Sequence, residues 1–240
     1  MRTCLVGSEM CIRDRRECNV LRFDLGSQLS DPNEIPARIL VILQGQARLV
    51  GRHNGRLTTV RKFGPGSVIG AASLLAGSPC ENVIAAEEVI ACGISDELWR
   101  ELYATEASFR HWCDQQLWPQ ELLKLLEALE QNTPEAESSA LEKLEDALQT
   151  AERCSPDPAA VDAALAAGKL LFVTSAWGEL TFGQPIRSSV DLPVCEPFSL
   201  RLVALPASGV SDNAQETMDD SSGSRVSASS IQDAEVLPPV

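Results

Sequence analysis

The sequence lacks the features that mark several common functional classes. Aromatic residues make up only 5% of the chain, and there are two histidines among its 240 residues. A membrane-spanning helix needs roughly 18 consecutive uncharged apolar residues, whereas the longest apolar runs here, at 39–43 and 170–173, are strand-sized. The sequence therefore predicts a chain that does not itself span a bilayer.

Metal-binding and nucleophile motifs are also missing. The eight cysteines form no CxxC pair and no Cys/His cluster, so metal ligands do not occur at short spacing. Two distant histidines cannot supply the several His and the carboxylate of a cupin-type metalloenzyme. Ser67, Ser73 and Ser78 have no recognisable His/Asp partners, which disfavours a hydrolase. We expect no enzymatic activity, and the scattered cysteines favour the reducing cytoplasm.

Positive charge is scarce in the second half of the chain. The formal net charge is -14, and residues 114–240 carry seven Lys/Arg against twenty-one Asp/Glu, which accounts for the whole excess. Such a surface repels phosphate backbones, so nucleic acid is not an expected partner. The composition instead predicts a solvated, partly disordered acidic region.

Between residues 20 and 94, short apolar segments alternate with Gly and Pro turns. Asn54-Gly55 is typical of a hairpin turn because glycine supplies the required positive φ, and Gly64-Pro65-Gly66 marks a second turn. Strands this short and regularly spaced predict an antiparallel, jelly-roll-like β-roll. The expected strands are 20–23, 39–43, 47–50, 57–63, 83–86 and 89–94, with a short helix at 71–75.

From residue 95 onward the apolar period becomes that of helices. Capping residues, an N-terminal proline and a leucine stripe at 122–129 support this. The expected helix starts are Ser95, Thr105, Pro119, Ser139 and Asp157, the last helix ending at Gly168. A hairpin is expected from 170–174 and 180–182 across Trp177-Gly178-Glu179, followed by a strand at 200–205. Beyond Pro206 the Ser- and Asp-rich composition predicts disorder.

These patterns predict an α+β chain in four parts. Residues 1–15 resemble a translated sequencing-adapter string, so the natural start is expected upstream. Residues 16–132 form the β-roll with its C-terminal helices, and 133–206 form a small α+β module. Residues 207–240 are expected to be a disordered acidic linker.

Three runs carry a resemblance to a known family: Ile42 to Leu49, Gly64 to Gly70, and Ser73 to Pro79. Together they resemble the cyclic nucleotide-binding domain superfamily over about 110 residues. In that family a short helix presents free N–H groups to the cyclic phosphate. An Arg binds the phosphate oxygens, and a Glu accepts a hydrogen bond from the ribose 2′-hydroxyl.

The resemblance implies a phosphate cassette whose ligand-holding side chains are replaced. Ala71 takes the position of the Glu and Cys80 that of the Arg, while Glu81 adds a negative charge beside the anion position. Truncating one partner of a buried charge pair costs roughly 2–5 kcal/mol, and about 1.4 kcal/mol is tenfold in affinity. We therefore expect no bound cofactor and disfavour cAMP and cGMP. The corresponding cassette residues are Gly70, Ala71, Ala72, Ser73, Leu74, Cys80, Glu81 and Asn82.

Two interpretations of this site remain. The first is a non-enzymatic regulatory domain. In that case the double substitution Ala71→Glu and Cys80→Arg should create or strengthen nucleotide binding. The second is a functional cyclic-nucleotide or other small-ligand sensor with non-standard contacts. A substitute cation could come from a basic cluster, although we favour a solvated outer strand face for it; its members are Arg48, Arg52, Arg56, Arg61 and Lys62. A transcription regulator needs a basic helix-turn-helix after the long helix, but acidic residues follow Asn132.

The run from Gln44 to Leu49 and the cassette are also similar to the N-terminal region of bacterial peptide or protein export ABC transporters. The chain contains no GxxxxGK[ST] loop, so this resemblance implies a cytosolic fragment at the inner membrane. The expected partners are then other domains of a larger chain or a second copy. Contact with the membrane would come only through flanking segments.

Overall fold

The computed structural model describes residues 18–53, 56–131, 140–176, 180–192 and 200–207. All of these belong to one compact unit, residues 1–210. Several predictions fall outside the described residues: the adapter-derived segment 1–15, the Asn54-Gly55 turn, the Ser139 cap, the turn at 177–179 and the linker beyond 207.

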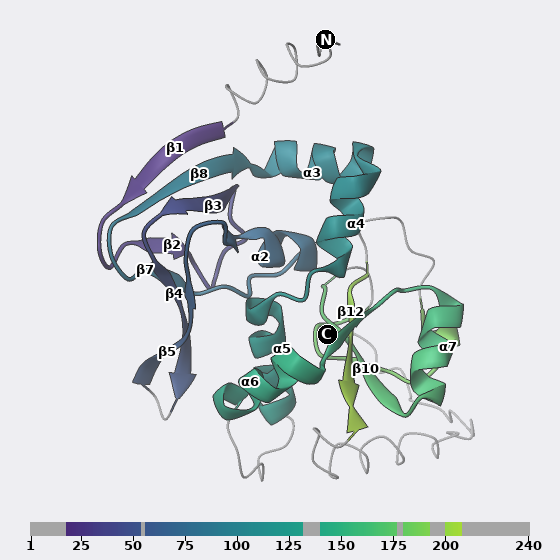
Figure 1. The fold of residues 1–240 in the computed structure, drawn as a ribbon. Coiled ribbons are helices and arrows are strands. Elements are labelled where there is room, and N and C mark those ends of the chain that lie inside the picture. Colours follow the sequence, from purple (N-terminus) through teal and green to yellow (C-terminus); the bar gives the residue numbers. More distant parts are fainter. Residues whose placement is uncertain (1–17, 54–55, 132–139, 177–179, 193–199, 208–240) are drawn as a thin grey trace, which may run out of the picture. The chain divides into compact units, whose positions relative to one another are not determined.

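A β-roll of two antiparallel four-stranded sheets forms the first part of the chain, as the sequence predicted (Figure 1). The strand orders are β1-β8-β3-β6 and β2-β7-β4-β5. Along β8 buried residues alternate with half-buried ones, which is the pattern of a strand with one face on the core. The strands are β1 (Cys18–Phe23), β2 (Gln28–Ser30), β3 (Arg38–Gln44), β4 (Ala47–His53), β5 (Arg56–Phe63), β6 (Val68–Ile69), β7 (Val83–Ala85) and β8 (Val89–Ser95).

The turn between β3 and β4 requires glycine. Gly45 has a φ of +87°, and a Cβ atom there would lie 2.0 Å from the carbonyl oxygen of Glu88. Both the backbone conformation and the close approach exclude a side chain. This turn therefore packs directly on the segment that leads into β8, on the side of the roll opposite the helices.

The first and third helices after the roll begin where the capping pattern predicted, whereas the second begins at Ala107 and the expected start, Thr105, ends the first. Ser95 caps α3 (Asp96–Thr105) by accepting a hydrogen bond from the Leu98 N–H, 3.2 Å away. The following helices are α4 (Ala107–Gln115) and α5 (Pro119–Gln131), and Pro119 is the first residue of α5. In the part of the chain that the structure describes, no helix is both long and apolar enough to cross a membrane.

The described residues between 140 and 207 form a third sheet with its own core, and we call the segment 140–207 the second module. It contains α6 (Ala140–Thr150), α7 (Pro158–Ala166) and a sheet in the order β11-β10-β12-β9. The strands are β9 (Glu152–Cys154), β10 (Lys169–Val173), β11 (Pro185–Ile186) and β12 (Leu202–Pro206). Asp157 caps α7 through the N–H groups of Ala159 and Ala160, as predicted.

The predicted hairpin of this second module has a different return strand. β10 pairs with Pro185–Ile186 and not with 180–182, and the prediction was wrong there. The reason is a tight turn: the Gln184 N–H donates to the Thr181 carbonyl, and Gly183, at φ +83°, donates to the Val173 carbonyl. Strand β9 was not predicted, because three residues between two helices carry too short a pattern.

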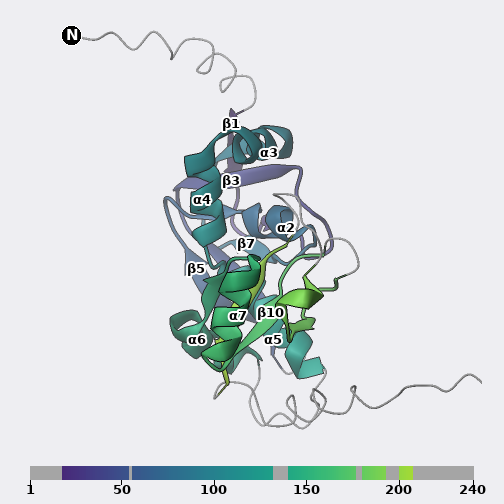
Figure 2. The same cartoon turned by 90° about the vertical axis from the view of Figure 1, so that its right-hand side faces the viewer.

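Helix α5 lies between the roll and the strands β10 and β12 (Figures 1 and 2). It packs against α2 (Ala71–Ala76) of the roll and against α6. Its leucine stripe is core, as the spacing indicated, since Leu122, Leu123, Leu125 and Leu126 are buried. α5 therefore contacts both the cassette helix of the roll and a helix of the second module.

Candidate functional site: the cassette and its cleft

The six-residue helix α2 sits where the cassette was predicted. Gly70 precedes it with a φ of +97°, a left-handed conformation that favours glycine. Ala71, Ala72 and Leu74 are buried in a core that includes Trp99 and contribute nothing to a solvent-facing site. The structure therefore separates the cassette into a buried helix and the segment 80–82 that follows it.

Glu81 is fully buried and points back at the start of α2. Its Oε2 accepts a hydrogen bond from the Gly70 N–H at 2.6 Å, and its Oε1 accepts one from the Ser73 N–H at 3.2 Å. These are amide groups at the helix start, where unpaired N–H donors and the helix dipole favour an anion. The sequence placed the Glu81 charge beside the anion position, whereas the structure places it on the amide donors themselves.

Burial raises the pKa of Glu81 to about 7, although the N–H groups of Gly70, Ser73 and Ala72 oppose the rise by favouring the charged form. Because the folded protein then holds the proton more tightly, this group stabilises the fold below about pH 4.5, and that stabilisation is lost as pH rises through about 7.

We expect Glu81→Gln to remove this pH dependence. The free energy of unfolding of the parent protein minus that of the variant should fall by at most roughly 3 kcal/mol between pH 5 and 8. Urea unfolding at several pH values measures the difference. Parallel pH profiles for the two proteins would contradict the assignment.

Cys80 and Asn82 line a cleft of about 510 Å³ between the roll and α5. The Cys80 N–H donates to Ser73 Oγ at 3.0 Å, and the Asn82 carbonyl accepts from the Val50 N–H at 2.8 Å, so the backbone of both residues is fixed. Burial and the neighbouring Glu81 raise the pKa of the Cys80 thiol. Cys80 is therefore a neutral wall residue and no substitute for a guanidinium.

Lys124 of α5 is a cation of this cleft that the sequence analysis did not single out. Its ammonium donates to Ser78 Oγ at 2.5 Å and to the Pro79 carbonyl at 2.7 Å, and it lies 4.5 Å from the centroid of the Phe182 ring. Burial lowers its pKa. It therefore binds the turn before Cys80. The sequence did not indicate this contact, because Lys124 lies among the leucines of a helical stripe.

The part of α5 that lines the cleft carries two carboxylates and the single ammonium group of Lys124. Glu127 and Glu130 line the cleft, and burial together with the charge of Glu130 raises the pKa of Glu127. The lining also includes the apolar side chains of Leu49, Val50 and Leu123. The cleft therefore has an acidic, partly apolar lining that repels anions.

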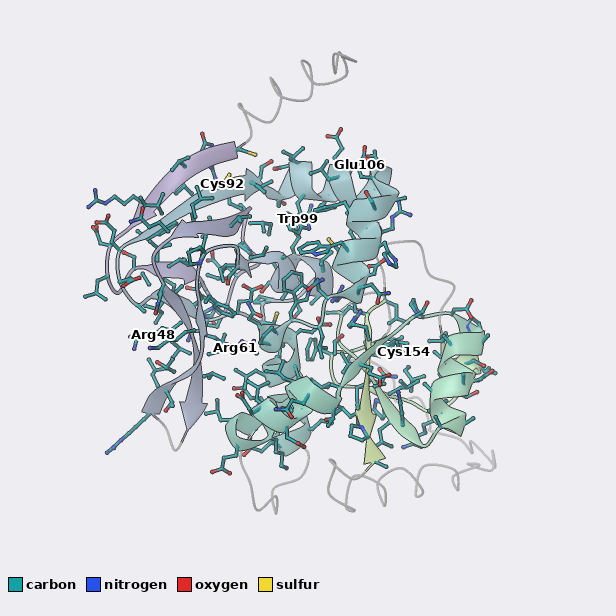
Figure 3. The ribbon with its side chains drawn as sticks, viewed as in Figure 1. Arg48, Arg61, Cys92, Trp99, Glu106 and Cys154 are labelled. Carbon is teal, nitrogen blue, oxygen red and sulfur yellow. The ribbon has the colours of Figure 1, made fainter. Side chains whose placement is uncertain are left out.

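The basic cluster of β4 and β5 does not line this cleft. The side chains of Arg48, Arg56, Arg61 and Lys62 are exposed, and Arg48 pairs directly with Lys62 across the two strands. Figure 3 shows Arg48 and Arg61 on this pair of strands. The described members of the cluster therefore form a solvated outer face, as the sequence analysis favoured.

A buried ion network centred on Glu121 of α5 was missed at the level of sequence. Glu121, with no exposed side-chain area, binds Arg201 at 2.9 Å and Arg153 at 3.0 Å, and the Thr174 hydroxyl donates to the same carboxylate. Burial alone would raise the pKa of Glu121, but the two guanidinium groups outweigh it and hold the pKa below its usual range. We call these four residues the Glu121 clamp.

Comparison with known protein families agrees with this fold. The family model described as "Cyclic nucleotide-binding domain" matches residues 20–106, which are 87 of the 240 residues. No curated protein matches the chain. Residues 20–106 are thus a domain of the cyclic nucleotide-binding type.

Similar solved structures include a cyclic nucleotide-binding domain from Methylobacillus flagellatus, with 19% identity and a TM-score of 0.37, covering 46% of this chain and 64% of that one. The regulatory subunit of a cAMP-independent protein kinase A from Trypanosoma cruzi, bound to guanosine, has 18% identity and a TM-score of 0.33, with coverages of 40% and 38%. The c-di-GMP responsive global regulator of Xanthomonas campestris has 18% identity and a TM-score of 0.35, with coverages of 42% and 50%. The chain spans less than two thirds of the length of each of these chains.

Proposed function

We propose that residues 18–131 are a non-enzymatic regulatory domain that no longer grips a cyclic nucleotide. The observation that carries the proposal is the Glu81 carboxylate on the N–H groups of Gly70 and Ser73. In the family these helix-start amides face the cyclic phosphate, so here an internal anion takes the ligand's place.

A cyclic nucleotide does not fit the residues present. Cys80 offers a protonated thiol where the family has an arginine, and Ala71 is fully buried where the family has a ribose-binding glutamate. A phosphate at the start of α2 would also find the N–H groups of Gly70 and Ser73 already bound by the Glu81 carboxyl group, and it would be repelled whenever Glu81 is ionised.

Isothermal titration calorimetry of the full chain with cAMP, cGMP and cyclic di-GMP tests this proposal. We expect no binding tighter than about millimolar, which corresponds to roughly 4 kcal/mol. Guanosine and adenosine serve as matched ligands without phosphate. Micromolar binding of any cyclic nucleotide would overturn the proposal.

A small-ligand sensor with non-standard contacts is the second candidate, and Lys124 is the observation that favours it. Its ammonium stands at the rim of a cleft large enough for a small molecule. The same titrations distinguish the candidates, because a sensor of this kind should lose affinity in Lys124→Met. Glu127 and Glu130 argue against this second candidate, because they make the cleft lining acidic overall.

The wider context stays a prediction. A cytosolic front end of an export transporter, with other domains or a second copy as partners and no nucleic acid, is compatible with a non-enzymatic regulatory role. Reading the uninterrupted gene beyond both ends of this chain tests it, since membrane spans and an ATPase should follow in the same frame.

A further inference from the structure

The cassette helix α2 is held at both ends by residues of this chain. Glu81 binds its first amides. At its other end the Ala76 carbonyl accepts a hydrogen bond from the Ala176 N–H at 2.7 Å. Ala176 follows β10, so this bond joins the end of the cassette helix directly to the second module.

Helix α5 is held in the same way, at two positions. Lys124 binds the turn at Ser78 and Pro79, which directly follows α2. The Glu121 clamp binds α5 to Arg153 of β9, to Thr174 directly after β10 and to Arg201 directly before β12. Arg201 also donates to the carbonyl groups of Cys113 and Gln116, which precede α5. The cassette helix α2 and the cleft-lining helix α5 are therefore both anchored in residues 140–207.

The contacts between α5 and the second module are buried, charge-assisted hydrogen bonds. The side chains of Arg153 and Arg201 are 10% and 6% exposed, and that of Glu121 is fully covered. Charge-assisted hydrogen bonds in such surroundings are poorly screened, and breaking one partner leaves an uncompensated charge. α5 cannot shift relative to the cleft without breaking this network or carrying the second module with it.

We propose that the second module is an intramolecular regulatory partner of the β-roll, which fixes the cleft-lining helix α5 through the Glu121 clamp and the cassette helix α2 through the Ala176–Ala76 bond. The state of the cassette is then set by residues 140–207 and not by a bound nucleotide. This inference rests on the proposed function, because it assigns to the second module the control that a nucleotide would otherwise exert.

Hydrogen exchange measured by mass spectrometry on the full chain, without nucleotide, tests the inference. In Glu121→Gln we expect amide exchange to accelerate at least about tenfold, equivalent to about 1.4 kcal/mol, in the second module and also in peptides covering α5 and residues 70–82. Thr174→Val removes one hydrogen bond of the clamp and should produce the same regional pattern with a smaller amplitude. Thr174→Val therefore provides the test if the Glu121→Gln variant fails to fold.

Glu152→Gln is the matched control. It breaks the exposed pair between Glu152 and Lys169 within the same second module, and it leaves α5 untouched. We expect exchange in residues 70–82 to stay at the parent level in this variant. Acceleration confined to 140–207 in the clamp variants, or equal acceleration of 70–82 in the control, would overturn the inference. The calorimetric titration of the parent protein is independent of both outcomes, so failure here is distinguishable from failure of the proposed function.

Discussion

Replacing Glu121 with alanine is expected to lower the free energy of unfolding by about 3–5 kcal/mol. The substitution removes the carboxylate with which Arg153 and Arg201 both form ion pairs, and it leaves two guanidinium groups in a nearly water-free interior. Desolvation lowers the pKa of Arg153 to about 10 even with Glu121 present, which shows how unfavourable this surrounding is for a charge. Urea unfolding at neutral pH measures the loss.

Two further variants separate this explanation from a general effect of losing a glutamate. Glu152→Ala removes a carboxylate that is 65% exposed, and exposed pairs contribute at most about 1 kcal/mol. The triple variant Glu121→Leu/Arg153→Met/Arg201→Met should recover much of the stability that Glu121→Ala loses, because no unpaired charge then remains. A Glu121→Ala variant within 1 kcal/mol of the parent would show that water or rearrangement satisfies both arginines.

The β-roll was predictable because its determinants are local. Turn glycines and period-two strands define β3, β4 and β5, and the Ser95 and Asp157 caps place α3 and α7 within a residue of their observed starts. The return strand of β10 was placed too early because Thr181 to Gln184 form a turn that depends on contacts with Val173. Such long-range contacts have no signature in a short window of sequence.

The site was predictable in its position and only partly in its chemistry. The spacing located the cassette and its missing arginine, but the role of Glu81 depends on which way one side chain turns. Lys124 and Glu121 lie on the same short helix as the leucine stripe, and the sequence gives no means of knowing that one contacts the cassette turn and the other two distant arginines. Charged residues of a mostly buried helix become functional candidates only once their partners are placed.

The structure also changes which substitutions should restore nucleotide binding. The exchange Ala71→Glu with Cys80→Arg would put a carboxylate at a fully buried position packed against the aromatic core. It would also leave Glu81 on the amides of Gly70 and Ser73. The pair Cys80→Arg with Glu81→Ala avoids both problems, since Cys80 already lines the cleft.

We expect Cys80→Arg/Glu81→Ala to bind cAMP about a hundredfold more tightly than the parent protein does. One substitution supplies a guanidinium, whose charge pair with a phosphate is worth roughly 2–5 kcal/mol, and the other frees the helix-start amides from an internal anion. Either substitution alone should gain little, because an arginine beside Glu81 pairs with that carboxylate, and free amides without a cation hold a phosphate weakly. Isothermal titration calorimetry with cAMP measures the gain.

Adenosine is the discriminating ligand, because both substitutions act on the phosphate and neither touches the part of the cleft formed by Leu49, Val50 and Leu123. The double variant should therefore gain affinity for cAMP and none for adenosine, and the gain should shrink as salt screens the new charge pair. Equal gains for both ligands would mean that the substitutions merely widened the cleft. No gain for either would mean that the amides of Gly70 and Ser73 are not the phosphate-facing groups, and the internal-anion explanation of the cassette would then be wrong.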